Sequence, residues 1–235
     1  MSRRYDLCLN LPARAHNNAA RSARKTVTMG KRARISSAVR RGPYLPPENW
    51  HEPDEDRAGR YRVIVQSAGE GFRHVVTPED VRQRLGQLPA WMVKPLAVVQ
   101  LSQMTRKKQR SACYGMQWGS AIYLYPIEEN LVETFCQPPK PAHKIEAAMY
   151  GARWEVPERG QWKLIWTEAA IRDFYLNNVL IHELGHILDS RNSSHRDRER
   201  YAEWFALEMG YKASRRADLA RRATSKYAIK RHDRS

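Results

Sequence analysis

The stretch His182-Glu183-Leu184-Gly185-His186 decides the fold, because its chemistry demands a particular helix and particular neighbours. It lies inside an apolar run, with Val179-Leu180-Ile181 before it and Ile187-Leu188 after it. On an α-helix, residues four apart lie on the same face about one turn apart. The two imidazoles can therefore bind one metal ion, and two histidines on one helical face supply half of a tetrahedral zinc site.

Glu183 lies between the two histidines, where an H-E-x-x-H site has the base that takes a proton from a metal-activated water. The alternative is a helix that carries these polar residues by chance, since so short a pattern has a real rate of false matches. Two imidazoles and a carboxylate in an apolar run are costly to bury unless they have partners. We therefore favour a metal site, with Zn²⁺ as the expected cofactor.

Glu199 is the candidate third metal ligand. Ser194 and Asp197 form an N-cap pair that predicts a second helix after a polar turn. Glu199 lies on this helix, 13 residues after His186, which leaves enough chain for a turn and a return. Ala202 shares its face and is small, so the second helix could approach the first closely.

Glu203 lies one turn beyond Glu199 and could hydrogen-bond a ligating imidazole, a contact that metal sites usually need. The alternative for both glutamates is a solvated acidic face, which is the ordinary role of glutamate on a helix. His195 is near the site in sequence. We expect a surface or hydrogen-bonded side chain rather than a ligand there and at three other positions, His51, His74 and His143.

The pattern His182-Glu183-x-x-His186 followed by Glu199-x-x-Ala202-Glu203 resembles the gluzincin metallopeptidases. Residues 199–206 are similar to the short ImmA/IrrE-type proteases, whose pattern runs E-x-x-A-x-x-F-A after HELGH. The match covers residues 176–210 and departs at its end, where those proteases often have a proline and this chain has none.

The resemblance implies a zincin-like α+β fold, in which a small twisted sheet lies over the histidine helix and the glutamate helix lies beside it. It implies zinc held by His182, His186 and Glu199, with Glu183 as the base in hydrolysis of a peptide or protein substrate. In gluzincin-like sites a histidine or tyrosine also stabilises the oxyanion. Tyr201 and Tyr211 are near in sequence, and no spacing rule chooses between them.

Charge is distributed unevenly along the 235 residues, whose net charge is +16. Residues 1–41 carry +10, residues 212–235 carry +7 and residues 42–211 carry −1. We therefore expect a basic, disordered arm over residues 1–45, a metallopeptidase domain over 46–211 and a basic tail over 212–235.

The basic ends keep a second class of function open, a nucleic-acid-binding protein whose zinc is structural or absent. The two ideas can combine, with basic tails that recruit a protease to nucleic acid. A third class is a partner-binding pseudoenzyme, against which the retained Glu183 argues, because a structural site needs no base. A solubility tail, an organelle address and attraction to an anionic membrane remain rival explanations of the basic ends.

The rest of the pattern predicts the elements around the site. In the resemblance, the strand before the metal helix, here residues 120–126, lines the cleft and pairs with the substrate backbone, and the alternative is an ordinary sheet strand. The expected elements are a strand over 61–65, a turn at 69–71, a returning strand over 72–76, a helix from the Thr77 cap to about 88, a buried strand over 96–101, a strand over 120–126 whose final proline suits an edge, a Pro-rich loop over 137–143, a hairpin of 150–156 with 161–166, and a long helix from 167.

Three cysteines without C-x-x-C spacing, Cys8, Cys113 and Cys136, predict reduced thiols in a cytoplasmic protein. No run of about 18 apolar residues occurs, so no membrane span is expected. The first segment lacks the apolar core of a secretion signal, although an Arg-rich, acid-poor start is also compatible with an organelle transit peptide.

Overall fold

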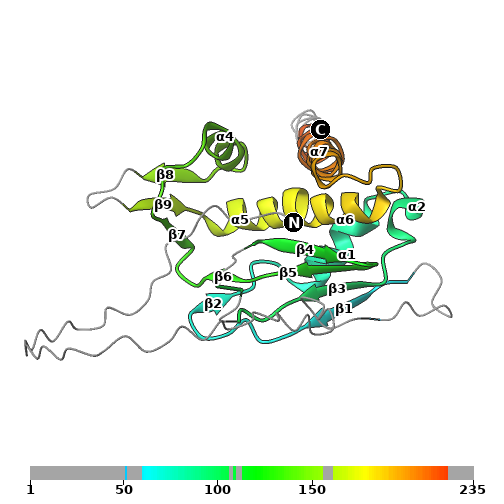
Figure 1. Ribbon diagram of the computed structural model, residues 1–235, viewed down its shortest axis with the longest axis horizontal. Helices are drawn as coiled ribbons and strands as arrows, with labels where there is room; N and C mark the ends of the chain where they lie inside the picture. Colours follow the sequence, from blue (N-terminus) through cyan, green and yellow to red (C-terminus); the bar gives the residue numbers. More distant parts are fainter. Residues whose placement is uncertain (1–50, 52–59, 106–107, 110–112, 156–160, 222–235) are drawn as a thin grey trace, which may run out of the picture. The chain divides into compact units, whose positions relative to one another are not determined.

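Figure 1 shows the computed structural model, which describes residues 51, 60–105, 108–109, 113–155 and 161–221. All of these belong to one of two compact units, formed by residues 1–9 and 51–235. The described part is a mixed α+β fold with small sheets, as predicted. The arm expected over residues 1–45 lies outside the described residues.

The larger sheet has four strands in the order β1 (Arg62–Val65), β3 (Val98–Leu101), β5 (Ala121–Leu124) and β4 (Gly115–Trp118). β1, β3 and β5 are parallel, and β4 runs antiparallel to β5. Every residue of β3 and β5 is buried, as is typical of central strands covered on both faces.

The predicted edge position of the strand before Pro126 is wrong. β5 pairs with β3 on one side and β4 on the other, and among the described strands β4 is the edge next to it. Pro126 lies beyond the last residue of β5, so its missing N–H removes no hydrogen bond from the ladder.

The expected pairing of residues 61–65 with 72–76 is also wrong. β1 pairs in parallel with β3, and the chain passes between them through β2 (Phe72–Arg73), α1 (Pro78–Gly86) and α2 (Ala90–Val93). β2 pairs instead with β6 (Ile127–Glu128). Parallel strands need a long crossover, and the predicted α1 helix occupies it. Its Thr77 hydroxyl accepts from the Asp80 N–H, while the Asp80 carboxylate accepts from the Thr77 N–H, which confirms the predicted cap.

A separate sheet of three strands has the order β7 (Val132–Phe135), β9 (Trp162–Ile165) and β8 (Arg153–Glu155). The antiparallel β8–β9 pair confirms the predicted hairpin. The expected Pro-rich loop ends earlier than predicted, because Pro141 begins helix α4 (Pro141–Met149). Proline suits the first turn of a helix, where its missing N–H has no partner to lose.

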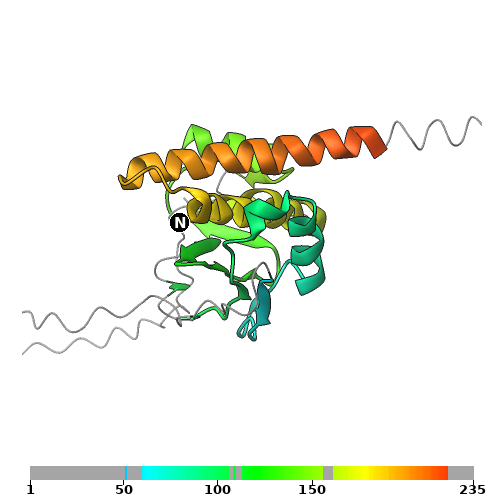
Figure 2. The same cartoon turned by 90° about the vertical axis from the view of Figure 1, so that its right-hand side faces the viewer.

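The long helix that carries the HELGH stretch comprises α5 (Glu168–Phe174), a π-helical segment η2 (Tyr175–Val179) and α6 (Leu180–Leu188). α7 (His195–Phe205) follows and continues as π-helical η3 (Ala206–Lys212). In Figures 1 and 2 the α5–α6 helix lies against the larger sheet, and α7 crosses it on the side away from the sheet. The Ser194 cap occurs as predicted, and Thr167, where the long helix was expected to begin, caps it.

Phe174 lies at the centre of an aromatic cluster that holds the long helix against the sheets. Its ring is 5.0 Å from Tyr114, 5.2 Å from Tyr150 and 5.0 Å from Trp166, measured between ring centroids. Edge-to-face and tilted aromatic pairs of this kind add directional preference to apolar burial. The cluster therefore sets the position of the residues that follow, including the HELGH stretch.

The tail that we expected from residue 212 is partly described. Residues 213–221 continue the helix of η3, and Arg215 forms an ion pair with Asp173 at 2.7 Å.

Cys113 is a buried free thiol, whereas Cys136 takes part in a disulfide, so the expectation of reduced thiols is wrong for Cys136. Spacing along the chain does not reveal a pairing that folding makes. Within the described residues, no helix is both long and apolar enough to cross a membrane.

Candidate metal centre

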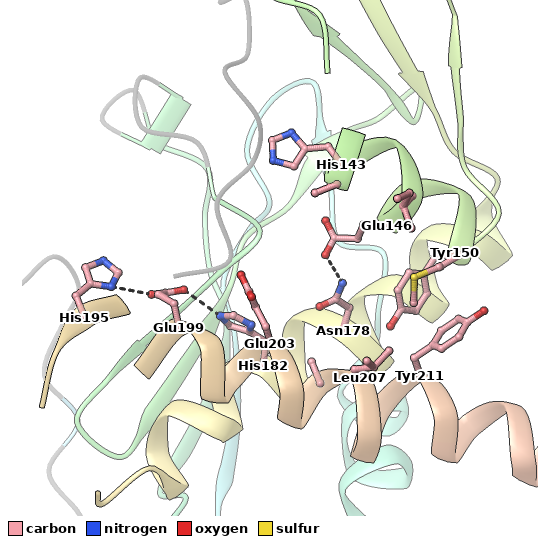
Figure 3. A pocket seen from close by; sticks show the side chains of 14 residues that line it. His143, Glu146, Tyr150, Asn178, His182, His195, Glu199, Glu203, Leu207 and Tyr211 are labelled. Atoms are coloured by element: carbon pink, nitrogen blue, oxygen red, sulfur yellow. Dashed lines mark hydrogen bonds and ion pairs between the residues drawn. The ribbon is translucent and has the colours of Figure 1, made fainter. Parts of the chain in front are cut away.

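The structure brings the three predicted ligands together. His182 and His186 lie one helical turn apart on α6, and Glu199 reaches both from the first turns of α7. Figure 3 shows Glu199 beside His182. The two Nε2 atoms are 3.2 Å apart. The Glu199 carboxylate lies 3.5 Å from His182 Nε2 through Oε2 and 3.6 Å from His186 Nε2 through Oε1.

These separations fit zinc. In a tetrahedral site with bonds of about 2.0–2.1 Å, neighbouring ligand atoms lie about 3.3–3.4 Å apart. The separation of the two imidazole nitrogens, 3.2 Å, is close to this edge length, and each nitrogen has a different Glu199 oxygen near it, at 3.5 and 3.6 Å. Two imidazole nitrogens and one carboxylate are also a donor set that zinc accepts at catalytic sites. The side chains present therefore match the expected cofactor in number, chemistry and spacing.

The surroundings of His186 and Glu199 favour the protonation states in which these side chains bind a metal. Burial lowers the pKa of His186, whose side chain is only 6% exposed, so its imidazole is neutral at physiological pH. Burial is the largest single influence and raises the pKa of Glu199, but the hydrogen bond with His182 and the electrostatic interactions with both histidines together lower it, so the carboxylate is ionised. A neutral imidazole and an ionised carboxylate are the forms that bind a metal.

The approach of α7 to α6 depends on small residues. Ala202 is fully buried, and a Cβ on Gly185 would lie 3.1 Å from its Cα. The close approach that Ala202 predicted is therefore present, and it places Glu199, one turn earlier on α7, within reach of both imidazoles. Arg198, also on α7, donates to the His186 carbonyl at 3.2 Å and ties the two helices together beside the site.

Glu183 lies on a different side of α6, towards the sheet. Its side chain is fully buried, and a Cβ on Gly115 of β4 would lie 3.2 Å from its Oε1. The same Cβ would lie only 2.6 Å from Val179 Cγ1, so glycine is needed here for the helix to pack on the strand. Glu183 therefore sits between the two histidines in sequence and beside the edge strand β4 in space.

A cavity of about 820 Å³ opens beside the centre, between α4, the long helix and α7 with η3. Figure 3 shows that Glu203 points into it from α7, and Glu203 is exposed. Among the described residues we find no hydrogen bond from Glu203 to either imidazole, so its expected contact with a ligand stays a prediction. The described lining is Ala142, His143, Ile145, Glu146, Met149, Tyr150, Asn178, His182, His195, Glu199, Glu203, Ala206, Leu207 and Tyr211.

Some of the other tyrosines and histidines considered in the sequence analysis line the cavity, and others lie away from it. Tyr211 lines the cavity, whereas Tyr201 packs against Phe205 with ring centroids 6.1 Å apart. His195 Nδ1 lies 3.4 Å from Glu199 Oε1, so this histidine supports the candidate ligand. His51 and His74 contact Gln100 Oε1 and the Gln66 carbonyl at 2.9 Å, as expected of hydrogen-bonded histidines.

The sequence did not point to the lining residues of α4 or to Tyr150 and Asn178. Asn178 Nδ2 donates to Glu146 Oε1 at 2.7 Å, which joins the long helix to α4 across the cavity. The Tyr150 hydroxyl donates to the Asn177 carbonyl at 3.2 Å. No motif marks these residues, although Asn178 precedes His182 by one helical turn and so lies on its face.

Both π-helical segments are held by one buried arginine. Arg84, on α1, donates through Nε to Asn177 Oδ1 and through a terminal nitrogen to the Met209 carbonyl, both at 2.6 Å. Burial lowers the pKa of this guanidinium. π-helical turns are rare and often occur at functional sites. Here they bring Asn178 and the end of η3 to the wall of the cavity.

No protein-family model, no curated protein and no solved structure matches this chain. The likeness of its HELGH and Glu199 segments to gluzincins therefore stays a prediction, and the case for function depends on the geometry of the site.

Proposed function

We propose that this chain is a zinc metallopeptidase with a zincin-like fold. The observation that carries the proposal is the group formed by His182, His186 and Glu199, each of which offers one ligand atom within 4.8 Å of the others. Three protein ligands leave the fourth position open, as catalytic zinc requires. Glu183, which follows His182 in sequence and is buried towards β4, adds a carboxylate that a purely structural site does not need.

The side chains have distinct roles in the proposed hydrolysis of a peptide bond. Zinc, when bound, lowers the pKa of water and polarises the scissile carbonyl. Glu183 accepts the proton of the attacking water and then delivers it to the nitrogen of the leaving amine. His182, His186 and Glu199 hold the metal, and His195 keeps the Glu199 carboxylate in position.

The edge strand β4 supports a peptide as the substrate. Among the described strands, β5 is the only partner of β4, and Gly115 of β4 lies against Glu183. An extended peptide that added to this edge would place its backbone beside the proposed base. Main-chain hydrogen bonds would then bind peptides of many different sequences, and pockets for the peptide's side chains would select among these peptides.

The test combines metal analysis with cleavage of a mixed peptide library. We expect about one zinc per chain in the wild type and in Glu183→Gln, which keeps the shape of the side chain. Activity should fall by several orders of magnitude in Glu183→Gln, because the proton acceptor is lost. Glu208→Gln, a change in an η3 carboxylate that binds Lys212 outside the cavity, is the control and should keep full activity. A wild type without zinc, or undiminished cleavage by Glu183→Gln, would end the proposal.

A further inference from the structure

The cavity beside the candidate metal centre has apolar walls that are open to solvent. Ile145 on α4 is 63% exposed and Leu207 on η3 is 36% exposed, and both line the cavity. Met149 and Ala206 extend the same two walls. Large apolar side chains left exposed on two facing elements indicate that an apolar part of a ligand lies between them.

The same cavity contains three glutamates beside its histidine, asparagine and tyrosine side chains. Figure 3 shows Glu146 reaching in from α4 and Glu203 from α7, on opposite sides. None of the lining residues that the structure describes is Lys or Arg, although the chain has 41 Lys and Arg against 25 Asp and Glu. Within the described part of the chain, Glu203 is exposed and has no ion pair. The cavity therefore favours cationic groups in a strongly basic protein.

The cavity also opens on the reactive centre, since His182 and Glu199 line it together with these walls. Two carboxylates alone would not define a site. Here they face each other across a partly open cavity, beside exposed apolar side chains and next to the candidate zinc ligands. A ligand that satisfies all of these features has an apolar stem, a cationic end and a backbone that reaches the metal.

We propose that this cavity is the specificity pocket for an arginine or lysine side chain next to the scissile bond. The methylene stem packs between Ile145 and Leu207, and the cationic head binds Glu146 and Glu203. This inference rests on the proposed peptidase function, because it names the side chain that the same site selects.

The test measures binding separately from hydrolysis. The probes are acetylated and amidated pentapeptides, Ala-Ala-X-Ala-Ala, with X as arginine, norleucine or glutamate, titrated into the full-length Glu183→Gln protein. A fourth probe carries norleucine and a free amino terminus. At physiological salt we expect the arginine peptide to bind about tenfold more tightly than the blocked norleucine peptide, and the glutamate peptide to bind most weakly.

Further substitutions in the Glu183→Gln protein test which residues produce the preference for the arginine peptide. Glu146→Gln and Glu203→Gln should each reduce the arginine preference severalfold, whereas Glu208→Gln, on η3 but outside the lining, should keep it. Zinc content measured for each variant separates a damaged metal site from a damaged pocket. Equal or tighter binding of blocked norleucine, no measurable binding of the arginine peptide, or a preference unchanged in both pocket variants would overturn the inference.

The free-amine probe distinguishes the source of the cation. If it binds as tightly as the arginine peptide, the pocket takes an α-amino group and the side-chain assignment is wrong. The two proposals can also fail separately. Library cleavage by the wild type without basic preference leaves the peptidase and removes the pocket, whereas an arginine preference in binding without any cleavage leaves the pocket and removes the peptidase.

Discussion

At the scale of single residues, the candidate site depends on which side chains can reach one point. His182 and His186 are brought together by one helical turn, and Glu199 is brought to them by the crossing of two helices. His195 adjoins Glu199, but its side chain is 73% exposed, and it is not one of the three residues whose ligand atoms lie mutually close. The chemistry of the site is therefore assigned to three ligands and one supporting histidine.

Removal of any one ligand should remove most of the zinc. We expect His182→Ala, His186→Ala and Glu199→Ala each to fall well below one zinc per chain, because two remaining ligands bind the metal weakly. His195→Ala is the matched control and should retain most of the metal. Metal analysis after dialysis measures both. Full zinc occupancy in Glu199→Ala together with loss in His195→Ala would transfer the third ligand to His195.

At the scale of elements, glycines let helices and strands meet where a side chain would prevent it. A Cβ on Gly210 of η3 would lie 1.9 Å from the Asn177 carbonyl oxygen of η2, a separation that no packing tolerates. At Gly185 the nearest atoms are 3.1 Å away, so the neighbours would need to move only slightly. The crossing of η2 and η3 is therefore the tightest of these contacts.

Gly210→Ala should destabilise the protein by about 3 kcal/mol or more, because the added methyl group forces the two π-helical segments apart. Gly86→Ala is the control. Nothing lies within 4 Å of a Cβ at that position, so alanine there should be neutral or slightly stabilising. Urea denaturation of both variants measures the free energy of unfolding. A Gly210→Ala protein as stable as wild type would show that the crossing is looser than described.

Arg84 holds the same crossing through hydrogen bonds. Arg84→Met should cost about 3 kcal/mol, because the Asn177 side chain and the Met209 carbonyl both lose a buried donor. Arg82→Met on the same helix removes only a surface pair with Glu79 and should change stability by less than about 0.5 kcal/mol. Chemical denaturation compares the two. Similar stabilities for the Arg84 and Arg82 variants would mean that water replaces the arginine.

At the scale of the whole molecule, the uneven charge remains the feature that the candidate site does not explain. Residues 1–41 carry +10 and residues 212–235 carry +7, whereas the region between them is almost neutral. Part of the positive charge of residues 212–235 contributes to folding, since Arg215 pairs with Asp173 and lies over the Tyr211 ring at 4.7 Å. The described part of the helix that begins with α7 extends to Arg221, so a truncation after this residue keeps all of it.

We expect the basic ends to bind nucleic acid without sequence preference, because phosphate contacts by Lys and Arg do not read bases. Affinity for a random DNA duplex should fall steeply between about 50 and 200 mM salt in the full-length protein, and should largely disappear in residues 42–221. Titration of both proteins at the two salt concentrations measures this. Equal, salt-insensitive binding by both, or binding by neither, would favour the rival explanations of the basic ends.

The features that the sequence alone determined are local. The spacing of His182 and His186, the Thr77, Thr167 and Ser194 caps and the smallness of Ala202 depend on helical period and hydrogen bonds between near neighbours. These rules act within a few residues, so they can be read along the chain. They were sufficient to predict α1, the long helix, α7 and the residues that meet at the candidate metal centre, but they did not predict α2 or α4.

Only the tertiary structure decided the strand pairing and the shape of the cavity. Residues 61–65 could have formed a hairpin with their neighbours, but β1 is stabilised in parallel with β3 across α1. The cavity arises where α4 faces η3, and the Asn178–Glu146 hydrogen bond in its lining joins residues 32 positions apart. The Arg84–Met209 hydrogen bond, which holds η3, joins residues 125 positions apart. Such contacts depend on how several buried faces pack at once, and the pattern of a single segment contains no information about the face that it will meet.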